Sequence, residues 1–506
     1  MSDVSRRSVL KAATSVMTLS MLSASARAAL AQETWDVIVV GGGTAGMPIA
    51  IFAAGRGARV LVIEKAPLLG GTLDRSTGQI AGAGTVFQKS KGIVDTPDAH
   101  YEDIMRINEH SSDPALCRLL VDNAADTINW LAENGFQVLP QHPVLGGGHE
   151  DFTTPRYLWG NDGGKTILAA MEPPFQRAVQ CGRVTVFTST AAVDLIKRPD
   201  GAISGIVTED DQGKRTDFRA RSVVLASGGC AANPTMYQEL HGSPLWTDMA
   251  YPFSQGDGLM LGLAAGGEIR GGEKYTGLFS ILLEDKTVPS ASQGFLRTYG
   301  TPEKPIHEIY VNSRGERFVR EDHPSIDHRE KAACRQPGQR FWAIFDDAIF
   351  ASGPLIVPSF SRDKLAASFN KHPMLTKAVT LSELGVRAGM DPARLQATAA
   401  AYNAALHSGG PDPLGRVVRP LPILKPPFYA VRAQTWSIVS FAGLNVDTRM
   451  RVLREDGRPV PNLYAAGEII GAGATMGNAY TNGMMVTPAL TFGRLLGSRI
   501  LPVGKI

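Results

Sequence analysis

The sequence predicts an α/β fold with a second domain inserted into the first, and two observations point to it. Up to Gly267, short apolar runs end in glycines and alternate with helical stretches, as in a parallel sheet covered by helices. From Glu268 to Tyr429 prolines and charges increase and the alternation is lost, but it returns in residues 430–506. We therefore predict one domain built from residues 32–267 and 430–506, interrupted by a domain of residues 268–429.

Length and composition agree with two domains and exclude some functions. A chain of 506 residues is too long for one simple core. Apolar residues make up 43% and charged residues 20%, which is ordinary for a globular protein. The formal net charge of +3 is small, and no basic stretch carries interleaved aromatic residues. Nucleic acid is therefore not an expected partner.

The region from Trp35 to Glu64 carries a dinucleotide-binding pattern. Val37 to Val40 form a β-branched run, which Gly41, Gly43 and Gly46 follow at the spacing G-x-G-x-x-G. The three glycines are expected to allow a tight turn, close approach of a pyrophosphate, and close packing of the next helix on the sheet. The N-terminus of that helix attracts phosphate, and Glu64 ends the second strand, where an acid accepts ribose hydroxyls. We predict a Rossmann-like domain that binds a dinucleotide; an ordinary glycine-rich turn is the alternative.

Residues 1–31 are predicted to be an export signal. Arg6-Arg7, in the segment SRRSVLK, forms a twin-arginine pattern, and residues 12–22 are apolar but too short for a comfortable membrane span. Ala29-Leu30-Ala31 resembles a cleavage site, with Ala26-Arg27-Ala28 as an alternative. We expect a mature chain that begins near Gln32 and works in the periplasm, or is otherwise exported by the twin-arginine pathway. A disordered basic N-terminus is the alternative, and no later stretch is apolar enough to predict a membrane span.

The cysteines give no sign of a metal site. Cys117, Cys181, Cys230 and Cys334 lie far apart with no C-x-x-C spacing, which argues against a zinc ribbon and against haem attachment. An exported protein could pair them, but the spacing selects no pairing. Buried, unpaired cysteines are the simpler expectation.

A family resemblance runs along almost the whole mature chain. Its pieces, in order, are GGGTAG with Glu64, GG at 70–71, LASGG at 225–229, GDG at 256–258, VNSRGERFVRED at 311–322, AIFDD at 343–347, NLYAAGE at 462–468 and TFGRLLG at 491–497. The set resembles the flavoprotein subunits of fumarate reductase and succinate dehydrogenase, and related soluble FAD enzymes such as urocanate reductase and the 3-ketosteroid Δ1-dehydrogenases. The resemblance implies an FAD-binding domain interrupted by an α+β capping domain, with the substrate held between them against the isoalloxazine.

The resemblance also implies the residues that contact FAD. The cofactor is expected to be bound non-covalently, because the segment after Gly71 lacks the histidine that anchors FAD in the respiratory subunits. The implied FAD contacts are Gly41, Gly43, Thr44, Ala45, Gly46, Glu64, Lys65, Gly70, Gly71, Thr72, Ser76, Thr77, Gly78, Ala192, Ala226, Ser227, Gly228, Asp257, Gly467, Glu468, Pro488 and Ala489.

The resemblance places a proton-transfer residue in the cap. In the fumarate reductases an arginine shortly after the RFV-x-E segment supplies the proton, and Arg329 in DHREKA takes the matching position, after a longer intervening segment. A guanidinium is a weak acid, so this role requires a desolvated site and a proton path. The alternatives are a fork that binds a substrate oxygen, or a surface arginine paired with Asp327 or Glu330. His323 and His328 flank this position, and either could pass protons.

The chain differs from the fumarate reductases at several positions that bind the substrate in those enzymes. The fumarate reductases carry one histidine soon after the GDG helix, where this chain reads YTGLFS, and another before a Gly-Gly, where it reads SIVSFAG. Their C-terminal arginine clamp is also missing from residues 471–486. A buried dicarboxylate without cationic partners is costly, so the pattern argues against fumarate and succinate.

A substrate site lined by apolar and polarisable side chains is expected instead. The lining implied is apolar, with Met476, Met484 and Met485 beside Phe279 and Phe441. The segment NAYTNG followed by TPA resembles the steroid dehydrogenases, in which a tyrosine hydroxyl and a glycine N–H hold the substrate carbonyl. Tyr480 and Gly483 are the counterparts, in a loop one residue shorter. Core packing is the alternative for Tyr480 and for the methionines.

Together these patterns predict an exported FAD-dependent oxidoreductase that acts on a C–C bond next to a carbonyl or carboxyl group. A fumarate-reductase-like reductase of an unsaturated carboxylate is the alternative, and a non-enzymatic FAD-binding factor is a further one. The chain contains no haem or iron–sulfur motif, so a separate cytochrome, quinone or oxygen is expected to exchange electrons with it.

Overall fold

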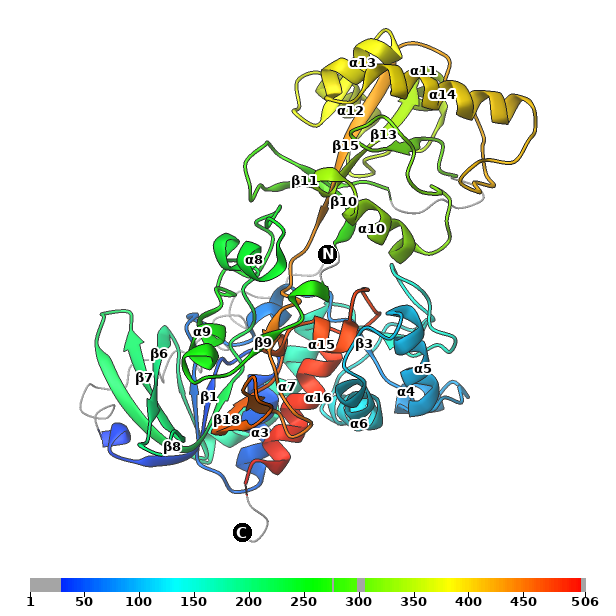
Figure 1. Cartoon of the computed structure of the whole chain (residues 1–506). Coiled ribbons are helices and arrows are strands. Elements are labelled where there is room, and N and C mark those ends of the chain that lie inside the picture. The colour runs from blue at the N-terminus through cyan, green and yellow to red at the C-terminus, as the bar shows by residue number, and fades with distance from the viewer. Residues whose placement is uncertain (1–28, 275–276, 298–304, 502–506) are drawn as a thin grey trace, which may run out of the picture.

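The computed structural model describes residues 29–274, 277–297 and 305–501, and two parts are visible in it (Figure 1). One part contains the first and last segments of the chain, and the other is drawn from green to orange above it. The signal predicted for residues 1–31 lies outside the described residues except for Ala29–Ala31. Its export function therefore stays a prediction.

The first part is built on an eight-stranded sheet, with the order β17-β18-β8-β1-β2-β5 and with β6 and β7 attached through β8. Strand β1 is parallel to both β2 and β8, and β18 is parallel to β8. These parallel strands therefore end at one edge of the sheet, where ligands of open α/β sheets bind. The strands are β1 (Thr34–Val40), β2 (Val60–Ile63), β5 (Val184–Phe187), β6 (Thr190–Lys197), β7 (Ile203–Asp210), β8 (Arg215–Leu225), β17 (Arg451–Leu453) and β18 (Pro459–Ala465).

Helices pack around this sheet, and α3 follows β1 directly. Helix α16, near the C-terminus, packs against both α3 and α6 from the first part of the sequence. Thr96 and Asp113 cap the N-termini of α5 and α6 through their side chains. The helices are α3 (Gly46–Gly55), α4 (Val86–Lys89), α5 (Pro97–Ile107), α6 (Pro114–Glu133), α7 (Gly164–Gln180), α8 (Pro234–His241), α9 (Asp257–Ala264), α15 (Gly473–Met476) and α16 (Val486–Arg499).

Residues 184–207 contain β-branched runs on both sides of a turn at Arg198–Gly201, a pattern that predicts two strands. This prediction is wrong, because the structure forms three strands: β5, β6 and β7. The apolar run breaks at Ser189, whose φ of 47° is left-handed, so β5 and β6 are separate strands. The predicted turn at Arg198–Gly201 joins β6 to β7.

The second part is built on a six-stranded antiparallel sheet, with the order β11-β10-β15-β13-β12 and with β14 also paired to β15. Its strands are β10 (Leu278–Leu283), β11 (Ser292–Phe295), β12 (Ile309–Val311), β13 (Arg340–Asp346), β14 (Leu375–Ala378) and β15 (Phe428–Trp436). Because β15 runs to Trp436, this sheet continues past the boundary predicted at residue 429. Below we call this second part the cap.

The cap has its own hydrophobic core, centred on β10, β13 and β15. Its sheet carries the helices α10 (Ile326–Cys334), α11 (Asp347–Ser352), α12 (Arg362–Ser368), α13 (Leu381–Ala388) and α14 (Pro392–His407). Helix α10 lies on the side that faces the first part (Figure 1). The observed α/β sheet with an inserted α+β domain agrees with the predicted fold class.

Two pairs of short strands complete the fold. Strand β9 (Ile269–Arg270) pairs with β16 (Gly443–Leu444), and β3 (Ile80–Ala81) pairs with β4 (Tyr157–Leu158). The 3₁₀ turns are η1 (Gly71–Arg75), η2 (Gly272–Lys274), η3 (Pro337–Gln339) and η4 (Glu468–Ile470). Among the described residues, no helix combines the length and apolar character needed to cross a membrane.

Candidate active site

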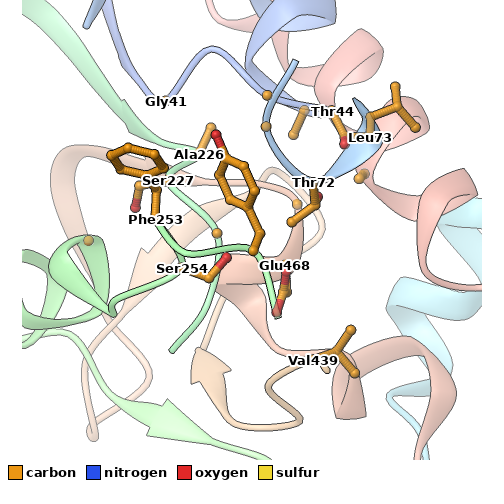
Figure 2. A pocket seen from close by; sticks show the side chains of 18 of the residues that line it. Gly41, Thr44, Thr72, Leu73, Ala226, Ser227, Phe253, Ser254, Val439 and Glu468 are labelled. Atoms are coloured by element: carbon orange, nitrogen blue, oxygen red, sulfur yellow. The ribbon is translucent and has the colours of Figure 1, made fainter. Parts of the chain in front are cut away.

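A cavity of about 350 Å³ lies at the carboxyl edge of the first sheet, beside the N-terminus of α3. Figure 2 shows Thr44, Thr72 and Glu468, from three different segments, pointing into the same space. Of the residues implied to contact FAD, those that line it are Gly41, Gly43, Thr44, Ala45, Glu64, Lys65, Gly71, Thr72, Ser76, Thr77, Ala192, Ala226, Ser227, Gly228, Asp257, Gly467, Glu468, Pro488 and Ala489. Segments far apart in sequence thus meet at one site.

Three of the implied FAD contacts do not line the cavity but directly adjoin residues that do: Gly46, Gly70 and Gly78. A Cβ on Gly46 would stand 1.9 Å from the carbonyl oxygen of Gly41, so α3 packs on the loop only without a side chain there. The N–H of Gly70 donates to the carbonyl of Gly42 at 3.0 Å. A Cβ on Gly78 would stand 2.3 Å from the carbonyl carbon of Gly163. These glycines shape the cavity through backbone packing.

Glu64 is held in place by two backbone N–H groups. Its Oε2 accepts from Gly42 and its Oε1 from Ala66, both at 2.7 Å. Burial raises the pKa of this carboxyl, while the backbone N–H groups lower it. Each oxygen has further acceptor capacity, so the carboxylate could receive hydroxyl groups from a ligand in the cavity.

The structure adds a loop that the sequence did not indicate as part of the site. Met249, Ala250, Tyr251, Phe253 and Ser254 also line the cavity. Figure 2 shows the ring of Phe253 among the side chains that line the cavity. The aromatic residues just before the GDG segment were a visible signal, because aromatic side chains can cover a flat ligand.

The cavity has the donors that a dinucleotide requires. Helix α3 has no side-chain cap at its N-terminus, and Gly43, Thr44 and Ala45 just before it line the cavity, so an anionic ligand there would meet the positive end of the helix dipole. Within the described chain, the buried Oγ of Ser227 has no hydrogen-bond partner, although it lines the cavity. Glu64 supplies an acceptor. The residues present therefore fit FAD.

Part of the cavity lining is apolar. It includes Ile438, Val439, Met484 and Met485, and Figure 2 shows Val439 on the opposite side of the view from Phe253. Burial raises the pKa of Glu468 in this lining to about 7, and the N–H of Ser440, which donates to it at 3.1 Å, lowers it in part. An apolar lining with one titratable carboxyl suits a flat ring better than a chain of charges.

Tyr480 and Phe441 meet just beyond this lining. Their ring centroids lie 5.6 Å apart in an edge-to-face arrangement. The hydroxyl of Tyr480 lies 3.0 Å from the Oγ of Ser437, the residue before the lining residue Ile438. Burial raises the pKa of Tyr480 well above its ordinary value, so the phenol stays neutral and can donate a hydrogen bond.

Gly483 packs against the short strand β3. Its φ is +77°, and a Cβ there would stand 2.6 Å from the backbone nitrogen of Ala81. Packing alone therefore requires a glycine at this position. The role of its N–H toward a substrate stays a prediction.

Arg329 is buried in the cap. Its Cζ lies 5.2 Å from the ring centroid of Phe279, and its Nη1 donates to the carbonyl of Glu321 at 3.4 Å. The side chain is thus unlike the exposed arginine of the alternative interpretation. Asp327 and Glu330, its suggested partners there, instead face His149.

His149 is the residue that sequence reasoning missed. Its Nδ1 lies 3.3 Å from Oδ1 of Asp327 and 3.6 Å from Oε2 of Glu330. Its ring stacks on Tyr480 with centroids 5.2 Å apart. Burial lowers the pKa of His149, but the two carboxylates outweigh this effect and raise it to about 10. A lone histidine after three glycines carries no signal, because all these partners are distant in sequence.

The predicted substrate residues therefore form two groups. Tyr480 and Phe441 belong to the first part, and Arg329 and Phe279 belong to the cap. Glu330 joins the cap group to His149, because its Oε1 accepts from the N–H of Phe279 at 2.9 Å.

Comparisons with known proteins show the family of the chain. A family model described as the FAD binding domain matches residues 36–483. The "Fumarate reductase (cytochrome)" of Shewanella frigidimarina is 28% identical over 487 residues, which cover 95% of this chain and 79% of that protein. The urocanate reductase of Eggerthella lenta is 28% identical over 473 residues, which cover 92% and 74%.

A solved structure shows the same fold. The 3-ketosteroid Δ1-dehydrogenase of Sterolibacterium denitrificans matches with a TM-score of 0.70 at 21% identity, covering 92% of this chain and 99% of that one. The resemblance drawn from the motifs is thus confirmed, as is FAD as the cofactor. The chain belongs to the FAD binding domain family, and it is an FAD-dependent oxidoreductase acting on CH–CH groups.

Proposed function

We propose that this enzyme dehydrogenates or reduces a C–C bond adjacent to a carbonyl or carboxyl group. One observation carries the proposal: a buried neutral phenol, Tyr480, and a buried guanidinium, Arg329, come from opposite sides of the junction between the first part and the cap. The relatives include a fumarate reductase and a 3-ketosteroid Δ1-dehydrogenase, which supports a substrate of this class.

The chemistry divides between the cofactor and the chain. Bound FAD supplies hydride transfer at its N5. Tyr480 donates a hydrogen bond to the substrate oxygen, which makes the neighbouring C–H more acidic. Arg329 either moves the proton or holds the substrate through its fork. The apolar residues around the cavity exclude water and favour an uncharged ring or chain.

The alternative is a reductase of an unsaturated carboxylate. The identity with the Shewanella fumarate reductase and the position of Arg329 favour it. Val439, Met484 and Met485 in the cavity lining are apolar and favour the carbonyl substrate instead.

Binding of FAD without a covalent link, export through the Arg6-Arg7 signal, and a separate cytochrome, quinone or oxygen as electron partner are parts of the same proposal. The relative named "Fumarate reductase (cytochrome)" supports a cytochrome as the electron partner.

Two substitutions separate the roles. Tyr480→Phe should lower kcat by a factor on the order of 10²–10³, as for the loss of one oxyanion donor. If Arg329 transfers the proton, Arg329→Ala should lower kcat on the order of 10²–10⁴-fold, whereas loss of binding alone raises KM. Both proteins should retain FAD, since neither residue lines the cavity.

Matched controls are Tyr101→Phe, which is half-buried on α5, and Arg335→Ala, which is exposed at the end of α10. Both controls should keep kcat and KM near wild type. If Tyr480→Phe and Arg329→Ala are as active as these controls, the proposed assignment is wrong.

A further inference from the structure

We propose that His149 is a positioning residue, which holds helix α10 of the cap, and with it Arg329, in register with Tyr480. The inference rests on the proposed function, because it assigns a shared task to these two groups. It adds a residue that acts through them without contacting the cofactor cavity.

One imidazole contacts both sides of the junction. On the cap side, Nδ1 of His149 lies 3.3 Å from Asp327 and 3.6 Å from Glu330. On the other side, its ring stacks on Tyr480 with an interplanar angle of 21°. The side chain is only 19% exposed, so little water competes for these contacts.

The backbone of the next residue, Glu150, also contacts both sides of the junction. The N–H of Glu150 donates to Oδ2 of Asp327 at 2.8 Å, and its carbonyl accepts from Nδ2 of Asn482 at 2.9 Å. The hydroxyl of Ser325 also donates to the Glu150 carboxylate at 3.3 Å. The segment 149–150 therefore joins α10 to the loop that carries Tyr480 and Asn482.

Charge explains why a histidine is needed. Asp327 and Glu330 are both buried, and their oxygens and Nδ1 of His149 all lie within 4.8 Å of one another. Two buried carboxylates this close repel each other, and an imidazolium between them offsets this repulsion. The groups around His149 are Asp327, Glu330, Tyr480 and the carboxylate of Glu150, which pairs with Arg106. The high pKa of His149 agrees with this role.

Glu330 extends the connection to the predicted substrate residues. Its Oε1 binds the N–H of Phe279, and Phe279 lies under the guanidinium of Arg329. Loss of His149 would leave Glu330 and Asp327 facing each other without a cation. Helix α10 would then shift away from Tyr480, and Arg329 would shift with it.

The test compares His149→Gln with wild type in the FAD-loaded enzyme. Glutamine keeps a hydrogen-bond donor but removes the charge. We expect kcat to fall at least tenfold, with the FAD dissociation constant unchanged and KM changed less than kcat. Added imidazole should restore part of kcat in His149→Ala. The control is His407→Gln, an exposed residue at the end of α14.

Coupling and exchange supply independent readouts. In an Asp327→Asn, Glu330→Gln background, His149→Gln should cost much less than in wild type, because its partners are gone. Hydrogen exchange of residues 326–334 should rise in His149→Gln and not in His407→Gln. This readout does not depend on turnover, so it stands even if no tested substrate reacts and the proposed function fails.

Three results would overturn the inference. One is a His149→Gln enzyme with wild-type kcat and wild-type exchange in α10. Another is a loss of FAD affinity equal to the loss of kcat, which would place the effect at the cofactor. The third is a divalent ion, such as Zn²⁺ or Mn²⁺, found bound to purified wild type and lost in His149→Gln, since these three residues would then be metal ligands.

Discussion

Glu64→Gln tests the cofactor site most sharply, because the structure shows what each carboxylate oxygen does. Both oxygens accept backbone N–H groups, from Gly42 and Ala66. Glutamine offers one acceptor oxygen and one NH₂ group, so one buried N–H loses its partner. An unsatisfied buried donor costs about 1–3 kcal/mol. The free energy of unfolding of the apoprotein should fall by that amount in a denaturant titration.

The same change removes the charged acceptor for a ribose hydroxyl. Hydrogen bonds to charged groups contribute about 1.5–3 kcal/mol, so their loss should raise the dissociation constant for FAD roughly 10- to 150-fold. Quenching of flavin fluorescence on titration into apoprotein measures it. Glu172→Gln, exposed on α7, is the control. A Glu64→Gln protein that is destabilised but binds FAD as tightly as the control would refute the ribose contact.

Three further predictions concern packing, pH and export. Gly46→Ala should destabilise the protein by about 1–3 kcal/mol in a denaturant titration, because its Cβ meets the Gly41 carbonyl, whereas Gly55→Ala in the same helix meets nothing within 4 Å and should not. The ordinary pKa of His149 is 6.5 and the folded value is about 10, so its stabilising contribution is complete below pH 6.5 and lost as pH rises through 10. Wild type should therefore lose Tm faster than His149→Gln between pH 7 and 10; equal slopes would contradict this. Replacing Arg6 and Arg7 with lysine should leave folded, yellow protein in the cytoplasm; periplasmic protein would disprove the export signal.

Local signals predicted which segments line the cavity. The strand, the glycine turn, α3 and Glu64 lie within one short stretch, so spacing alone indicated that they would lie close together. The motifs at residues 225–229 and 462–468 added the neighbouring strands β8 and β18. Their order in the sheet depends on crossovers that the local pattern does not show.

Contacts between segments far apart in the chain could not be predicted from the sequence. His149 carries no periodicity or motif, and its role depends on Asp327 and Glu330 in the cap and on Tyr480 near the end of the chain. The break at Ser189 was missed because a single left-handed residue leaves a β-branched run almost unchanged in composition.

We propose that this enzyme exchanges a hydride between FAD and a C–C bond beside a carbonyl or carboxyl group. Anaerobic absorbance spectroscopy of the purified holoenzyme tests it with two panels of compounds. Saturated ketones and acids are added to the oxidised enzyme, and enones and enoates to the dye-reduced enzyme. At least one class should bleach or restore the visible flavin band, and Tyr480→Phe should slow the change. A fully FAD-loaded enzyme whose flavin band stays unchanged across both panels would contradict it.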